Sequence, residues 1–81
     1  MRTLNEQEKQ RVLFIVADTL GYFEEEVDDN NSLTDDLGMD SLDQVEICMG
    51  IEKEFNINIP DSEFENVKTV QDLYSCVEKF L

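Results

Sequence analysis

The sequence predicts an all-α protein: a small four-helix bundle with three longer helices, one short helix, and a long loop between the first and second helices. Apolar residues recur at helical spacing in three segments, near residues 4–20, 41–55 and 70–81. Residues that commonly cap helices stand at the start of each segment. Alternation typical of a strand is confined to residues 57–59. Because 81 residues supply one small core, we expect a single domain over residues 1–81.

The first helix is predicted to begin near Leu4, because Thr3 and Glu6 have the spacing of a capping box. Gly21 is suited to end this helix, since glycine readily adopts the left-handed conformation found after helices. Phe14 falls outside the side that should face the core. That side consists of four apolar residues at helical spacing: Val12, Ile15, Val16 and Leu20.

An acidic, turn-rich segment, residues 21–40, follows the first helix. Loops of this length are unusual in a compact domain and are often functional where they occur. Val27, Leu33 and Leu37 are the expected apolar anchors of the loop to the core. Its polar residues imitate the start of an EF-hand calcium loop, but Leu33 replaces the glycine and Met39 replaces the final glutamate. No specific metal site is therefore predicted.

The second helix is predicted to run from Ser41 to about Phe55, with Asp40 as its N-cap. On a helical wheel this helix has two apolar sides. One is an ordinary core side, formed by Ile47, Cys48, Ile51 and Phe55. The other is rimmed with carboxylates and is formed by Leu42, Val45 and Met49. This second side could pack under the long loop or could be an exposed docking surface, and we expect a mixture of the two.

The last two helices follow from Pro60 and from a second pair of capping residues. Pro60 is predicted to open a short helix over the residues DSEFE, at its first helical position. Thr69 and Asp72 have capping-box spacing and should begin the final helix. The apolar side of that helix is expected to consist of Val70, Leu73, Tyr74, Val77 and Leu81.

The composition is strongly acidic, with 20 Asp and Glu residues, 6 Lys and Arg residues, and a formal net charge of −14. Nucleic acids and anionic membrane surfaces carry the same sign and are excluded as partners, whereas basic patches on other proteins are favoured. No apolar run approaches the roughly 18 residues of a membrane span. The first ten residues lack the apolar stretch of a signal peptide. We therefore expect a cytoplasmic protein, and we expect it to be a monomer.

Ser41 lies among aspartates in the stretch DDLGMDSLDQVE, residues 35–46. The chain has no histidine, so a Ser–His pair for catalysis cannot form. Ser41 is either an ordinary residue of a first helical turn or a site that another enzyme modifies. A phosphate ester there would face free backbone N–H groups and the positive end of the helix dipole. Cys48 and Cys76 show no metal-binding spacing, which indicates two reduced thiols in or near the core.

The stretch DDLGMDSLDQVE resembles the phosphopantetheine-attachment motif of the acyl carrier proteins. The resemblance covers nearly the whole chain, because a first helix ending in LG, a long acidic loop, EFNINIPD and KTVQDLY also match. It implies a four-helix bundle that is not an enzyme, with 4'-phosphopantetheine attached to Ser41 between Asp40 and Leu42. The thiol of that arm would hold an acyl group as a thioester, and the bundle interior would shelter the acyl chain.

The same resemblance implies partners: phosphopantetheinyl transferase, and enzymes of fatty acid synthesis that carry basic docking patches. Family contacts to such patches map onto Asp40, Leu42, Asp43, Val45, Glu46, Met49 and Glu52. Gly50 and Lys53 depart from the usual pattern, in which alanine and an acidic residue are common. The expected function is acyl carriage in fatty acid biosynthesis. The alternatives are a dedicated carrier for polyketide, peptide or D-alanine transfer, and an unmodified acidic adaptor protein.

Overall fold

The structure, a computed structural model, describes residues 2–81. Its first helix, α1 (Glu6–Leu20), begins two residues later than predicted. The capping box is formed by Asn5 and Glu8, and the predicted box at Thr3 is wrong. Asn5 Oδ1 accepts a hydrogen bond from the Glu8 N–H at 2.8 Å, and Glu8 Oε1 accepts one from the Asn5 N–H at 3.0 Å.

Leu4 explains the later start of α1. Its side chain is buried, and its N–H donates to Glu78 Oε2 at 2.8 Å. The chain therefore reaches Asn5 as an extended segment that is hydrogen-bonded to Glu78, near the other end of the sequence. At its far end α1 stops as predicted, because Gly21 takes the left-handed conformation with φ 83° and donates its N–H to the Ala17 carbonyl.

The second and fourth helices begin where the sequence predicts. Helix α2 (Ser41–Phe55) follows Asp40 as its N-cap, and α4 (Val70–Lys79) follows Thr69, whose hydroxyl accepts from the Asp72 N–H. Asp72 in turn accepts from the N–H groups of Lys68 and Thr69, and these hydrogen bonds lower the pKa of its carboxyl.

Two details of the second half differ from the predictions. Pro60 is the residue before α3 (Asp61–Phe64) and has an extended backbone, so it is the N-cap and not the first helical residue. The alternating residues 57–59 belong to the connection between α2 and α3, in which Ile59 is buried. Leu81 lies beyond the end of α4 and is exposed, because the helix stops at Lys79.

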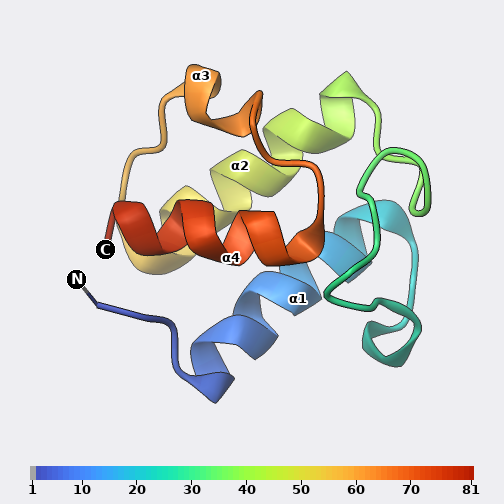
Figure 1. Ribbon diagram of the computed structural model, residues 1–81, viewed down its shortest axis with the longest axis horizontal. Coiled ribbons are helices and arrows are strands. Elements are labelled where there is room, and N and C mark those ends of the chain that lie inside the picture. The colour runs from blue at the N-terminus through green and yellow to red at the C-terminus, as the bar shows by residue number, and fades with distance from the viewer. Residues whose placement is uncertain (1) are drawn as a thin grey trace.

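The helices pack around one apolar core (Figure 1). Helix α1 packs against α2 and α4, and α3 packs against α4. The N- and C-terminal ends lie on the same side of the bundle (Figure 1). The most deeply buried side chains come from all three long helices and from the loop: Val12, Val16, Leu33, Ile47, Ile51, Val70, Leu73 and Val77. The predicted all-α bundle with three longer helices and one short helix is confirmed.

The long loop, residues 21–40, is ordered by the core and by the start of α4. It contains one 3-10 turn, η1 (Glu24–Glu26), and its predicted anchors Val27, Leu33 and Leu37 are all buried. Three main-chain hydrogen bonds join it to residues 68–71: Leu33 N–H to Lys68 O, Val70 N–H to Asn31 O, and Gln71 N–H to Asp29 O. These hydrogen bonds therefore fix the conformation of the loop that leads into α2.

Candidate functional site

Ser41 is the first residue of α2. Its position is set by a capping box whose two members, Asp40 and Asp43, lie before and after it in the sequence. Asp40 Oδ1 accepts a hydrogen bond from the Asp43 N–H at 2.8 Å, and Asp43 Oδ2 accepts one from the Asp40 N–H at 3.2 Å. The two carboxylates thus satisfy two backbone donors at the helix start. Both face backbone atoms of the same turn, which explains why acidic residues flank the serine.

The end of the loop is fixed just before this helix. Met39 is buried, and its N–H donates to the Leu33 carbonyl at 2.9 Å. Gly38 has φ 74°, a left-handed conformation that glycine adopts without the steric cost of a side chain. The glycine of the DDLGMDSLDQVE stretch therefore turns the chain so that Met39 enters the core and Ser41 faces solvent.

The Ser41 side chain is exposed, and its hydroxyl makes no hydrogen bond with any side chain or backbone atom of residues 2–81. The hydroxyl is thus accessible to another enzyme. The N–H groups of Ser41 and Leu42 belong to the first helical turn, where backbone donors have no intrahelical acceptor. They also lie at the positive end of the helix dipole. The start of α2 therefore fits a phosphate ester on Ser41.

A hollow of about 240 Å³ adjoins Ser41, and we call it the Ser41 hollow. Its lining residues come from α2 and from the α3 region: Ser41, Gln44, Val45, Cys48, Asp61, Phe64 and Glu65. Apolar surface predominates in this lining. Residues 61–65 were not expected at the site, because no sequence motif connects them with Ser41. Only the packing of α3 near α2 brings them there.

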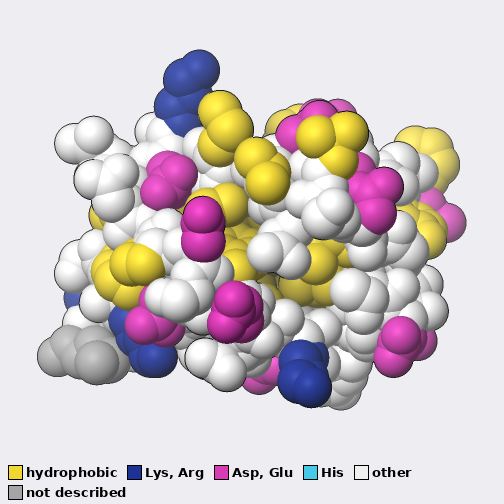
Figure 2. Space-filling view, turned by 90° about the horizontal axis from the view of Figure 1, so that it is seen from above, with side chains coloured by type: hydrophobic (Ala, Val, Ile, Leu, Met, Phe, Trp, Pro, Cys, Tyr) yellow, Lys and Arg dark blue, Asp and Glu magenta, His cyan; other side chains and the backbone are white. Residues whose placement is uncertain are grey.

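Leu42, Val45 and Met49, which we call the docking stripe, are exposed on α2 with exposed fractions of 66%, 53% and 62%. The expected mixture of core packing and exposure is therefore wrong, since all three side chains are exposed and none belongs to the core cluster. Their helical spacing turns them away from the core side. Figure 2 views the protein from above and shows hydrophobic side chains emerging between carboxylates on that face. The docking stripe is an apolar surface with an acidic rim.

The carboxylates predicted to bind partners differ in their exposure and in whether they already form hydrogen bonds within the protein. Glu46 is exposed and makes no hydrogen bond or ion pair among residues 2–81. Asp43 is half-buried and belongs to the capping box. Glu52 is also half-buried, and its Oε2 accepts the Ile59 N–H at 2.8 Å. Of these three side chains, Glu46 is the one that has no structural task to give up when a partner binds.

Cys48 and Cys76 are buried free thiols, as predicted. Cys48 also lines the Ser41 hollow. Burial, with the charges of Glu52 and Asp61, raises its pKa to about 11. Burial likewise raises the pKa of Cys76. A thiol that keeps its proton is a weak nucleophile, so the Cys48 thiol in the wall of the Ser41 hollow is unreactive at neutral pH.

Oxygen-bearing side chains of the long loop accept hydrogen bonds from backbone N–H groups of the loop itself. Asp36 Oδ2 accepts the Ser32 N–H at 2.7 Å, and Asn31 Oδ1 accepts the Asp28 N–H at 2.7 Å. Among residues 2–81, no three His, Cys, Asp or Glu side chains converge in a way that could hold a metal ion.

Over residues 2–81, none of the helices combines the length and the apolar character that crossing a bilayer requires.

Comparison with models of known protein families matches residues 10–77 to the family described as "Phosphopantetheine attachment site". The match covers most of α1, all of α2 and α3, and most of α4, with the loops between them. It confirms the resemblance to the acyl carrier proteins. Members of this family carry a covalently attached 4'-phosphopantetheine group, and their domains are carriers that other enzymes load and use. The chain therefore belongs to the phosphopantetheine-carrying family of carrier proteins.

Proposed function

We propose that Ser41 is the attachment residue and that the protein carries acyl intermediates of fatty acid biosynthesis as thioesters on its phosphopantetheine arm. The observation that supports this most is the Ser41 hydroxyl, which is exposed, forms no hydrogen bond within residues 2–81 and lies next to an apolar hollow. A modifying enzyme can reach such a hydroxyl without opening the bundle. The attached group supplies a flexible arm with a thiol at its end.

The residues around Ser41 have distinct parts in this proposal. The N–H groups of Ser41 and Leu42 stabilise the negative phosphate, and Asp40 holds the helix start in shape through its hydrogen bond to Asp43. Val45 and Phe64 line the Ser41 hollow and offer the apolar surface that an acyl chain would contact. An apolar cargo favours fatty acid synthesis over transfer of a charged amino acid.

Partner recognition is assigned to the docking stripe and its acidic rim. Asp40, Leu42, Asp43, Val45, Glu46, Met49 and Glu52 are the proposed contact residues. Apolar contact gives affinity, whereas the carboxylates attract basic patches and speed association. The proposed partners are phosphopantetheinyl transferase and enzymes of fatty acid synthesis. We further propose that residues 1–81 act as one carrier domain, as a monomer, in the cytoplasm.

The intact mass of the protein tests the attachment residue. The wild type, Ser41→Ala and the control Ser62→Ala are each incubated with phosphopantetheinyl transferase, coenzyme A and magnesium. Ser62 is exposed on α3 and lines no hollow near Ser41, so its variant should gain one phosphopantetheine mass as the wild type does. Ser41→Ala should gain none. A mass gain in Ser41→Ala would refute the assignment, and no gain in the wild type would favour the unmodified adaptor.

The cargo is tested on the loaded protein with two kinds of activating enzyme, one for fatty acids and one for D-alanine. Acylation with a fatty acid supports the proposal. Acylation with D-alanine alone would instead assign the protein to the dedicated carriers.

A further inference from the structure

A second apolar surface lies on α1, apart from the docking stripe. Phe14 on α1 and Phe23 just before η1 have exposed fractions of 53% and 73%. Two exposed phenylalanines on one side of so small a protein are costly to hydrate and need an explanation. The half-buried Tyr22 stands between them in sequence, and its hydroxyl donates to the Leu37 carbonyl. The ring of Tyr22 is thereby fixed beside the two exposed rings.

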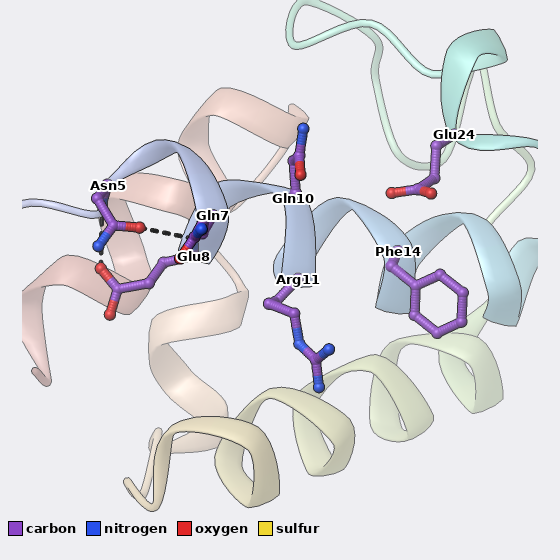
Figure 3. Close-up of a pocket in the computed structure, with 7 residues that line it drawn as sticks. All are labelled: Asn5, Gln7, Glu8, Gln10, Arg11, Phe14 and Glu24. Carbon is purple, nitrogen blue, oxygen red and sulfur yellow. Dashed lines mark hydrogen bonds between the residues drawn. The ribbon is translucent and has the colours of Figure 1, made fainter.

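Two hollows of about 650 Å³ and 280 Å³ meet at this surface, because both are lined by Phe14 and Glu24. The larger follows α1 from Asn5 to Phe14, and the smaller continues to Phe23. We call the two together the α1 groove. Figure 3 shows Glu24 reaching over the larger hollow from η1, whereas Phe14 and Arg11 border it from α1. The α1 groove shares no lining residue with the Ser41 hollow.

The charges of the α1 groove are unbalanced. Arg11, the one cation among the described lining residues, is already paired with Glu54 at 2.8 Å. Asp18 and Glu24 line the smaller hollow, are exposed, and form no ion pair among residues 2–81. The groove thus combines aromatic rings with two free carboxylates. An occupant that complements it must bring apolar side chains and positive charges together.

We propose that the α1 groove binds a cationic amphipathic segment of a partner protein. An apolar residue of that segment fills the space between Phe14 and Phe23, and Lys or Arg residues pair with Asp18 and Glu24. Arginine has a further advantage, since it can also stack on an exposed aromatic ring. The charge of the groove opposes two other occupants. A second copy of the chain would bring another net charge of −14, and an anionic membrane would repel the same carboxylates.

This proposal does not depend on the carrier function, because a segment in the α1 groove leaves the Ser41 hollow uncovered. The probe is a fluorescein-labelled peptide of leucine and lysine at helical spacing, and its counterpart has glutamate in place of lysine. Fluorescence anisotropy gives the Kd with the full-length protein at low ionic strength. The lysine peptide should bind and the glutamate peptide should not. Amide shifts in NMR spectra should concentrate in residues 10–25.

Variants locate the binding site. The double variant Phe14→Ala/Phe23→Ala should weaken binding about tenfold or more, since large aromatic anchors dominate such interfaces. The matched control, Leu42→Ala/Met49→Ala, removes two equally exposed side chains from the docking stripe and should change Kd less than twofold. Glu24→Gln should also weaken binding, and its neighbour Glu25→Gln, which lines neither hollow, should not. Circular dichroism confirms that each variant is folded.

Three results would overturn the proposal. The first is an equal loss of binding in both double variants, which would mean that the peptide binds the α1 groove and the docking stripe without preference. The second is a shift of the largest NMR changes to the docking stripe. The third is a concentration-dependent dimer in sedimentation that Phe14→Ala/Phe23→Ala abolishes, because a second copy would then occupy the groove. Phosphopantetheine loading of Phe14→Ala/Phe23→Ala and of Glu24→Gln is measured in parallel and should equal that of the wild type, so failure here is separable from failure at Ser41.

Discussion

Glu52 Oε2 accepts a hydrogen bond from the Ile59 N–H at 2.8 Å, and this bond ties the last turn of α2 to the connection that leads into α3. Ile59 is buried, so its N–H would otherwise lack a partner away from water. The connection in turn places α3 beside the Ser41 hollow. A residue that family resemblance assigns to partner binding thus has a structural task within the chain.

The first prediction concerns this hydrogen bond. Glu52→Ala should lower the free energy of unfolding by about 1–2 kcal/mol, because it leaves a buried backbone donor unpaired. Glu52→Gln keeps an acceptor oxygen and should recover most of that loss. Glu46→Ala is the matched control on the same helix and should change stability by less than about 0.5 kcal/mol. Urea denaturation of the three variants gives the comparison. Equal stability of Glu52→Ala and Glu46→Ala would contradict the role of the bond.

The second prediction concerns docking. Glu46→Lys should raise the KM for loading by phosphopantetheinyl transferase, and the wild-type KM should rise as salt is added, because exposed charges are screened. Glu46 is a cleaner probe than Asp43, since a lysine at Asp43 would also remove half of the capping box. Glu25→Lys changes the net charge equally on η1 and serves as the control. If both lysine variants raise KM alike, net charge and not the docking stripe governs recognition.

The third prediction concerns Gly50, a glycine in the interior of α2. A Cβ atom placed there would lie 3.1 Å from Ile15 Cγ2, which is closer than an ordinary contact. Alanine should gain roughly 1 kcal/mol of helix propensity and lose part of it to this crowding. Gly50→Ala should therefore stabilise the protein more in an Ile15→Ala background than in the wild type. Thermal unfolding of the double-mutant cycle measures the difference, and strict additivity would show that the α1–α2 contact is not tight.

The fourth prediction concerns the pH dependence of the Cys48 thiol, whose pKa burial raises from 9.0 to about 11. At pH 8 its alkylation by iodoacetamide should be about a hundredfold slower than that of a free cysteine. The folded state binds this proton more tightly than the unfolded state does. The contribution to stability is therefore complete below pH 9 and is lost as the pH rises towards 11. Peptide mapping after timed alkylation separates Cys48 from Cys76, and fast labelling of Cys48 at pH 8 would indicate that the hollow opens to water.

Local patterns of the sequence were enough to predict all four helices and the position of Ser41 at the start of α2. Apolar spacing and capping residues act within one or two helical turns, so Asp40, Thr69 and Gly21 reveal the helix ends at which they stand. The start of α1 was missed because two capping pairs compete there. Asn5 prevails over Thr3, since Leu4 is buried and its N–H is held by Glu78, a residue from the other end of the chain.

The sequence alone therefore determined the helices, the acidic character and the serine that matches the attachment motif. The tertiary structure decided which side chains those helices expose or bring together. It placed Phe64 beside Ser41, engaged Glu52 in a bond to Ile59, and left the whole docking stripe open. It also set Phe14 beside Glu24 in the α1 groove. These relationships depend on how α1, α2, α3 and the long loop share one core, and the packing of distant segments leaves no periodic signal in a single sequence.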